Sequence, residues 1–346
     1  MIRRVKFENF RNYKKAEAEI RSDLVLILGK NGSGKTNFLE SLFYLSNLYS
    51  FRAPDLALVK TEETFFALEA EDDRHRFEVV VETVPRVRRG NKIDGVKTKR
   101  TAWNSFGSVL FIPNDLNLFI LGPGARRSFL NQTIVQKDKI YASSLAGLDH
   151  VLKQKTALLN DILAGKENPG ALDFWNEQLC ELSTVITEAR RGFLDFFRIR
   201  FAEVYAKLTG FDNIFGIEYK SQPISLEILK AHEQAEIGSG SCLIGPHRDD
   251  FVIKKDGQLN IYNSSRGELR SQILTMKLLE AEFLAGRDKP VILLDDVFSE
   301  LDEIRRAKLI ENLSGSQIFI TSTEEHHLPK LASSAQIFKV EDNGII

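Results

Sequence analysis

The residue types between positions 29 and 36 are those that bind phosphate groups in nucleotide-binding loops. They read Gly-Lys-Asn-Gly-Ser-Gly-Lys-Thr and match the pattern G-x-x-x-x-G-K-[ST] at every fixed position. The glycines let backbone N–H groups curl around a phosphate, while the lysine and the hydroxyl residue can reach the outer phosphates and Mg²⁺. This pattern predicts that ATP binds to the following residues: Gly29, Lys30, Asn31, Gly32, Ser33, Gly34, Lys35 and Thr36.

Two adjacent acids near the carboxyl terminus could complete the same site. Asp295 and Asp296 directly follow an apolar run at 291–294. Such a run is typical of a buried strand, and α/β sheets place their ligands at the carboxyl ends of strands. We expect Asp295 to hold Mg²⁺ together with Thr36. Lys35 and Asp296 are the expected catalytic residues, the lysine at the β- and γ-phosphates and the acid beside the attacking water.

These motifs need strands and helices that bring them together. The continuous apolar run at 24–28 predicts a strand buried on both faces, directly before the glycine-rich loop. Apolar residues at 3-4-3 spacing predict a helix from about residue 35 to residue 49. Short alternating segments predict a β-rich subdomain at about 60–112. Two apolar stripes, at 145–162 and 175–208, predict packed antiparallel helices.

The separation along the chain between Lys35 and Asp295 decides the expected architecture. The strands that carry them must lie in one sheet, yet most of the 346 residues separate them. The chain must therefore leave the nucleotide domain, form the helical part and return, which is the plan of ABC-type ATPase heads. We expect an α/β fold in which residues 1–112 and 241–346 form a P-loop ATPase head. Residues 113–240 are expected to form an inserted, mainly α-helical arm domain.

A short serine- and glycine-containing segment precedes the acidic strand. Residues 264–268 read Ser-Ser-Arg-Gly-Glu and resemble the S-x-G-[QE] signature of ABC ATPases, with Ser265, Gly267 and Glu268 at its fixed positions. A serine hydroxyl and a glycine N–H at a helix N-terminus could contact the γ-phosphate held by a second subunit. The same residues also suit an ordinary N-cap with a capping acid. Their place before the acidic strand favours ATP binding, and residues 299–302 resemble the D-loop of the same class.

The balance of charge limits how nucleic acid could bind. Lys plus Arg number 47 and Asp plus Glu number 48, which excludes a protein that binds nucleic acid through its overall charge. A local basic segment lies between residues 86 and 100, where only Asp94 opposes the positive charges. It could follow DNA phosphates or could be a solvated loop, and it shows no base-reading module. The expected DNA-binding residues are Arg86, Arg88, Arg89, Lys92, Lys97, Lys99 and Arg100.

Cysteine usage and hydropathy indicate the compartment. Only Cys180 and Cys242 occur, which fits a reducing environment and excludes a disulfide scaffold. No apolar stretch has the length of a signal peptide or a membrane span. We expect a cytoplasmic protein without a membrane partner.

A family resemblance is carried by segments 7–13, 29–36, 50–52, 122–130, 245–250 and 291–302. Together these segments resemble the RecF family of bacterial recombination mediators, which is related to SMC-type ATPases. The resemblance covers nearly the whole chain. It implies ATP-dependent homodimerisation, weak DNA-stimulated ATPase activity that serves as a timer, and binding to single-stranded, double-stranded and gapped DNA. It also implies a role in recombinational repair with RecR and, indirectly, RecA as partners.

The chain departs from the family pattern at two places, and alternatives remain open. Asn114 stands where the family usually has an acid, and 321–323 reads Thr-Ser-Thr where a switch histidine is expected; His326 and His327 come later. A DNA-repair ATPase of another SMC- or OLD-like family would need longer coiled coils or a nuclease motif. A DNA-binding protein with a vestigial nucleotide site is the non-enzymatic alternative. The basic segment argues against a transporter subunit.

Overall fold

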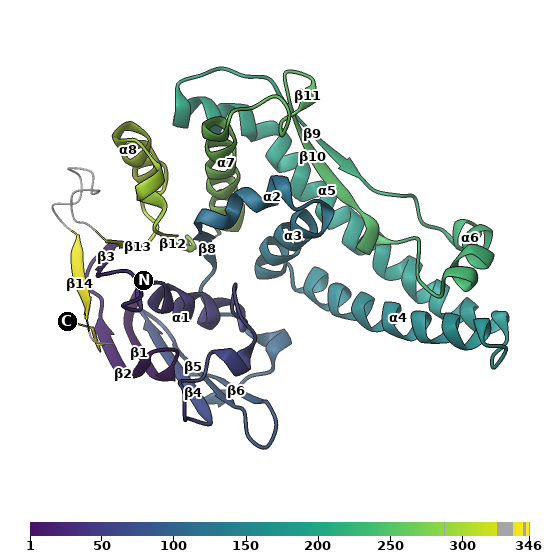
Figure 1. Cartoon of the computed structure of the whole chain (residues 1–346), viewed down its shortest axis with the longest axis horizontal. Helices are drawn as coiled ribbons and strands as arrows, with labels where there is room; N and C mark the ends of the chain where they lie inside the picture. Colours follow the sequence, from purple (N-terminus) through teal and green to yellow (C-terminus); the bar gives the residue numbers. More distant parts are fainter. Residues whose placement is uncertain (287, 324–334, 342–343, 346) are drawn as a thin grey trace. The chain divides into compact units, whose positions relative to one another are not determined.

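The apolar run at 24–28 forms an interior strand of a six-stranded, mainly parallel sheet in the computed structural model (Figure 1). Because β3, β12 and β13 are parallel neighbours, their carboxyl ends meet at one edge of the sheet. The structure describes residues 1–286, 288–323, 335–341 and 344–345, without the side chains of residues 101, 299 and 300. In sheet order the strands are β15 (Gly344–Ile345), β14 (Gln336–Glu341), β3 (Leu24–Leu28), β13 (Ile318–Ser322), β12 (Val291–Asp295) and β8 (Ser108–Phe111).

The alternating segments of the first hundred residues form a second, antiparallel sheet. Residues along each strand alternate between buried and exposed, as expected when one face covers a core. β6 and β7 are joined at Asp94 and Gly95, whose φ values of 53° and 76° suit a tight hairpin turn. In sheet order the strands are β2 (Tyr13–Glu19), β1 (Ile2–Phe10), β4 (Phe65–Asp72), β5 (Arg76–Glu82), β6 (Arg88–Ile93) and β7 (Val96–Lys97).

Helix α1 (Lys35–Asn47) packs against both sheets (Figure 1). The apolar spacing predicts one buried face, but every residue from 38 to 45 is buried. The ring of Phe38 shows why, because it lies 5.3 Å from the Phe7 ring of the antiparallel sheet and 6.1 Å from the Phe319 ring of the parallel sheet. A helix covered all round must bury its polar residues too, and Glu40 is fully buried.

The two apolar stripes form the long helices α4 (Lys139–Leu163) and α5 (Leu172–Thr209). Tyr141 contacts Arg190, while His150 contacts Trp175, so the two helices run antiparallel as predicted. Shorter elements accompany them. These are α2 (Asn117–Ile120), α3 (Pro123–Lys137), α6 (Leu226–Ser239), and a three-stranded sheet of β11 (Gln258–Leu259), β10 (Asp250–Lys255) and β9 (Phe215–Lys220).

The chain divides into two compact units. Unit 1 comprises Met1–Asp115, Lys207–Thr209 and Ile273–Ile346, and unit 2 comprises Leu116–Ala206 and Gly210–Gln272. The chain therefore returns to unit 1 near residue 273, later than the expected residue 241. The reason is the pairing of β10 with β9, which keeps 250–259 with the helices.

Two further helices follow the three-stranded sheet. They are α7 (Arg266–Leu284), which crosses the boundary between the units, and α8 (Glu303–Asn312) in unit 1. Across the described part of the chain, no helix combines the length and the apolarity needed to cross a membrane.

Candidate functional site

The phosphate loop lies between β3 and α1, as its sequence pattern requires. Its backbone uses conformations that favour glycine, with φ values of 81° at Gly32 and 117° at Gly34. The Lys35 ammonium donates to the carbonyl oxygens of Gly29 at 2.7 Å and of Lys30 at 2.9 Å. Burial lowers the pKa of Lys35, and the carboxylates of Asp296 and Asp295 oppose that shift. The Lys35 ammonium thus lies next to the loop that would hold the phosphates.

The acidic strand places an oxygen-rich site beside the loop. The Thr36 hydroxyl lies 2.9 Å and 3.0 Å from the two carboxylate oxygens of Asp295. The Thr321 hydroxyl donates to the same carboxylate at 2.8 Å and accepts the backbone N–H of Asp296 at 3.0 Å. Hydroxyl and carboxylate oxygens are the ligands that Mg²⁺ prefers. Thr36 and Asp295 therefore fit the expected metal.

Asp296 occupies a special backbone position at the end of the acidic strand. Its φ is 53°, in the left-handed region, and it precedes the short helical turn Val297–Glu300. Asp and Asn tolerate this conformation better than most residues. After Asp295 the chain turns away from the strand direction. Asp296 remains near Lys35, where its carboxylate acts to raise the pKa of the lysine.

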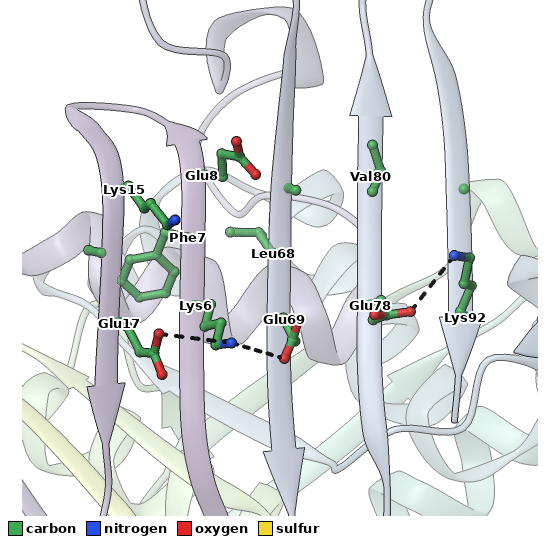
Figure 2. A pocket seen from close by; sticks show the side chains of 13 residues that line it. Lys6, Phe7, Glu8, Lys15, Glu17, Leu68, Glu69, Glu78, Val80 and Lys92 are labelled. Atoms are coloured by element: carbon green, nitrogen blue, oxygen red, sulfur yellow. Dashed lines mark ion pairs between the residues drawn. The ribbon is translucent and has the colours of Figure 1, made fainter. Parts of the chain in front are cut away.

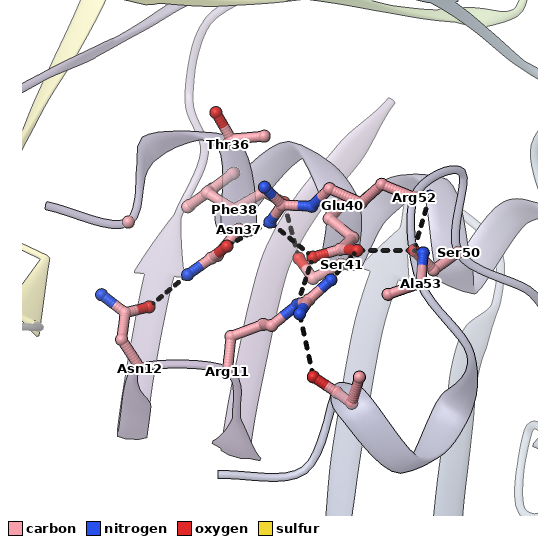
Figure 3. A network of polar contacts seen from close by, with 12 residues as sticks. Arg11, Asn12, Thr36, Asn37, Phe38, Glu40, Ser41, Ser50, Arg52 and Ala53 are labelled. Carbon is pink, nitrogen blue, oxygen red and sulfur yellow. Dashed lines mark hydrogen bonds and ion pairs between the residues drawn. The ribbon is translucent and has the colours of Figure 1, made fainter. Parts of the chain in front are cut away.

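The side-chain amides of Asn12 and Asn37 are hydrogen-bonded to each other beside the phosphate loop (Figure 3). Asn12 donates to the Ser33 carbonyl at 2.8 Å, and Asn37 donates to the Asn12 side-chain oxygen at 2.6 Å. Gly34 packs so closely here that an added Cβ would lie 2.5 Å from the Asn12 amide nitrogen. The turn between β1 and β2 thus fixes the loop conformation, because it carries Asn12.

Glu40 is the centre of the network that Figure 3 shows. Both of its carboxylate oxygens accept from Arg11 at 2.8 Å, while Arg52 adds a bond of 2.7 Å and the Ser50 hydroxyl one of 2.5 Å. Arg52 also donates to the Asn37 side chain, which joins this network to the amides beside the phosphate loop. Burial raises the pKa of Glu40, but the bonds from Arg11, Arg52 and Ser50 outweigh it, so the pKa lies below its usual value.

The signature-like segment lies in unit 2, at the start of α7. The Ser265 N–H donates to the Glu268 carboxylate at 2.8 Å, and the Glu268 N–H donates to the Ser265 hydroxyl at 3.3 Å. This reciprocal pair is a capping box. Ser265 and Glu268 therefore cap α7, as an ordinary N-cap would. The same residues can still act as an S-x-G-[QE] signature, since a capped helix N-terminus is what would contact a phosphate.

The basic segment divides by the face of the sheet on which each side chain lies. Arg89 pairs with inward-facing Val81 across the strands, and its guanidinium binds the buried carboxylate of Asp55. Lys92 lies on the outward face, 4.0 Å from the Glu78 carboxylate. The remaining members are exposed and form no ion pair within the described part of the chain: Arg86, Arg88, Lys97, Lys99 and Arg100.

The outward face of the antiparallel sheet is neutralised by cross-strand pairs (Figure 2). The Lys6 ammonium lies 3.9 Å from both Glu17 and Glu69, on either side of it. These charges surround a depression of ≈ 290 Å³ whose lining includes Val80 and Gly90. Because acids alternate with lysines, this face offers no continuous positive surface. The candidate DNA contact is therefore the hairpin and its flanks.

Several residues of the site were not predicted. Thr321 stands near the expected place of the switch histidine and contacts the metal-binding acid, while His326 and His327 lie outside the described residues. One feature of the sequence could have indicated the role of Glu40: it is a single acid within a run of apolar residues on the predicted helix. The D-loop-like segment keeps its place after β12, with a turn at Val297–Glu300.

The fold and the site define a class of protein. A phosphate loop between a parallel strand and a helix, an acidic strand two places away in the sheet, and an inserted helical unit are the parts of an ABC-type P-loop ATPase head. The model of the RecF/RecN/SMC N terminal domain matches residues 1–345. The chain belongs to the RecF family, a family of DNA replication and repair proteins.

Similar proteins cover almost the full length of the chain. The DNA replication and repair protein RecF of Moorella thermoacetica is 35% identical over 95% of this chain and 91% of its own. RecF of Acetivibrio thermocellus is 32% identical, with 94% and 93% covered. A solved structure of the recombination mediator protein RecF-ATPrS in the RecFOR pathway is 28% identical, covers 100% and 97%, and has a TM-score of 0.90.

A more distant solved structure has the same fold. The SMC head bound to the C-winged helix domain of ScpA is 15% identical, covers 100% and 97%, and has a TM-score of 0.56. The family membership replaces the alternative of another SMC- or OLD-like family.

Proposed function

We propose that this chain is an ATP-dependent DNA-binding protein of recombinational repair, in which ATP-driven dimerisation clamps DNA at gaps or junctions. Slow, DNA-stimulated hydrolysis would act as a timer that opens the clamp. The proposed partners are DNA, a second copy of the chain, RecR and, through RecR, RecA. The relatives support this proposal, since they include DNA replication and repair proteins and a recombination mediator of the RecFOR pathway.

One observation carries the enzymatic part of the proposal. The Thr36 hydroxyl and the Asp295 carboxylate meet at 2.9 Å although 259 positions separate them in the chain. A vestigial nucleotide site would have no need to keep a hydroxyl, a carboxylate and the Lys35 ammonium together at one sheet edge. This meeting of groups therefore favours an active ATPase over a purely structural DNA-binding protein.

Each proposed site residue has a defined chemical part. The backbone N–H groups of residues 29–36 bind the phosphates, and Lys35 neutralises charge that develops on the γ-phosphate. Thr36 and Asp295 would hold Mg²⁺, which supplies further charge neutralisation. Asp296 orients the attacking water and accepts its proton. From the second subunit, Ser265 and Gly267 would donate hydrogen bonds to the γ-phosphate, beside Glu268.

ATP turnover with and without DNA tests the enzymatic part directly. We expect the wild-type protein to hydrolyse ATP slowly and faster with gapped DNA. Lys35→Ala should lower that rate by about a hundredfold, because it removes the cation at the phosphates. Lys153→Ala is the control and should retain the activity, since this lysine of α4 has a side chain that is 75% exposed and pairs with Asp149 of the same helix. No turnover in the wild-type protein would favour the vestigial site.

The proposed DNA contact makes a prediction about salt. Neutralised phosphates release counterions, so each lost contact should lower the slope of log affinity against log salt by about one unit. Affinity should fall alike for DNAs of different base sequence, because phosphate contacts carry no sequence information. The measurement is a titration at several salt concentrations with a variant that replaces the following residues by alanine: Arg88, Lys97 and Lys99.

A control for this experiment removes equal charge from the opposite edge of the same sheet. β2 is the edge strand farthest from β6 and β7 in the sheet order. If the control lowers the slope as much as the hairpin variant does, the DNA contact lies elsewhere. The control variant replaces the following residues by alanine: Lys14, Lys15 and Arg21.

A further inference from the structure

A buried lysine of unit 2 lies beneath the start of α7. Lys255 is the last residue of β10, it is 8% exposed, and its ammonium binds the Glu268 carboxylate. Its neighbour Lys254 points the other way, is 41% exposed in its side chain and pairs with Glu218 at 2.8 Å. Burying an ammonium is costly without a charged partner. The pair with Glu268 therefore accounts for the presence of Lys255 at this position.

This ion pair is part of the capping box described above. One Glu268 oxygen binds Lys255, which leaves the other to accept the Ser265 N–H at 2.8 Å. The Ser265 hydroxyl accepts from the Glu268 N–H, so its own hydrogen can still be donated to a ligand. The ammonium thus fixes the orientation of a carboxylate that in turn fixes the serine.

A second set of bonds holds the preceding turn in place. The Asn260 amide donates to the Gln272 side chain at 2.9 Å, and Gln272 donates to the Ser264 hydroxyl at 2.9 Å. Asn260 and Gln272 are both almost completely buried. Because these bonds already fix the turn, the Lys255 side chain acts on the orientation of Glu268 and, through it, of Ser265.

Charge gives Lys255 a second effect at this helix start. A free carboxylate at the position of Glu268 would repel a phosphate that approaches Ser265 and Gly267. The ammonium of Lys255 holds the pKa of Glu268 below its usual value, so the acid stays ionised, and it offsets the negative charge at the same time. Without Lys255 the helix would present an uncompensated anion to an anionic ligand.

We propose that Lys255 is a positioning residue for ATP-dependent dimerisation. Its ammonium neutralises Glu268 and fixes Ser265 in the orientation that would contact the ATP of the partner subunit. This inference rests on the proposed function, since it requires the signature-like segment to contact that ATP. It assigns no contact between Lys255 and the nucleotide. Its effect should therefore appear in dimerisation and be absent from ATP binding by the monomer.

Dimerisation in the presence of a non-hydrolysable ATP analogue tests the proposal. Sedimentation should show that Lys255→Met needs about ten times more analogue than wild type for half-maximal dimer. The dissociation constant of the analogue from dilute monomer should stay unchanged. The double variant Lys255→Met with Glu268→Gln should recover to within about threefold of wild type, because it removes the uncompensated charge. Lys254→Met is the matched control and should behave as wild type.

The outcomes separate this inference from the proposed function. A wild-type protein that stays monomeric would overturn both. A dimerising wild type with an equally dimerising Lys255→Met would overturn the inference alone, and so would a double variant no better than Lys255→Met. If Lys255→Met fails to fold, Lys255→Gln removes the same charge but keeps a hydrogen-bond donor for Glu268, and the same comparison applies.

Discussion

Replacing Asp296 with asparagine should leave ATP binding intact and lower hydrolysis by about a hundredfold or more, because the amide cannot accept the proton of the attacking water. The backbone argues that the variant will fold. Asparagine tolerates the left-handed φ of 53° at this position, and the N–H that binds Thr321 is retained. The consequence for the clamp is that ATP, once bound, should hold two subunits together for much longer than in the wild type.

Two measurements check this expectation. Single-turnover hydrolysis should show the lost rate, and sedimentation with ATP should show a persistent dimer. Asp295→Asn provides the contrast, because it removes a carboxylate that binds Thr36 and should weaken Mg²⁺-dependent nucleotide binding itself. An Asp296→Asn variant that stays monomeric at saturating ATP would contradict the ATP-driven clamp. Undiminished turnover would show that another group accepts the proton.

The phosphate loop and the acidic strand could be placed from the sequence because their chemistry is local. Residues 29–36 have a fixed spacing, and the strand before Asp295 is recognisable by its apolar run alone. The long helices could also be predicted, since their apolar stripes repeat over many turns. In each case a short segment contains all the information that is needed.

The remaining features depend on contacts between distant segments. The return of the chain to unit 1 near residue 273 depends on pairing between β9 and β10, which neither strand specifies by itself. Arg89 and Lys92 look equivalent in the sequence, yet only Arg89 lies opposite the buried Val81 and pairs with the buried carboxylate of Asp55. The partners of Lys255 and Glu40 likewise come from other elements. Charge patterns predict which residues are available, and only the fold decides which are already paired.

Replacing Glu40 with glutamine should cost about 3 kcal/mol in the free energy of unfolding, because it removes the buried charge with which Arg11 and Arg52 pair. Glutamine keeps the size of the side chain, so lost packing contributes little. Glu17→Gln is the matched control. That acid is 44% exposed where it pairs with Arg4 and Lys6, and its loss should cost less than about 1 kcal/mol. Denaturant titration at pH 7 measures both values.

The same network predicts a pH dependence with a definite sign. Because the pKa of Glu40 is lower in the folded protein than in the unfolded chain, its contribution is complete above the unfolded value near 4.5. It is lost as the pH falls from there through the folded pKa. The difference in unfolding free energy between wild type and Glu40→Gln should therefore shrink as the pH falls below about 4.5. A difference that is small at pH 7, or that persists unchanged in acid, would show that Arg11 and Arg52 do not need this carboxylate.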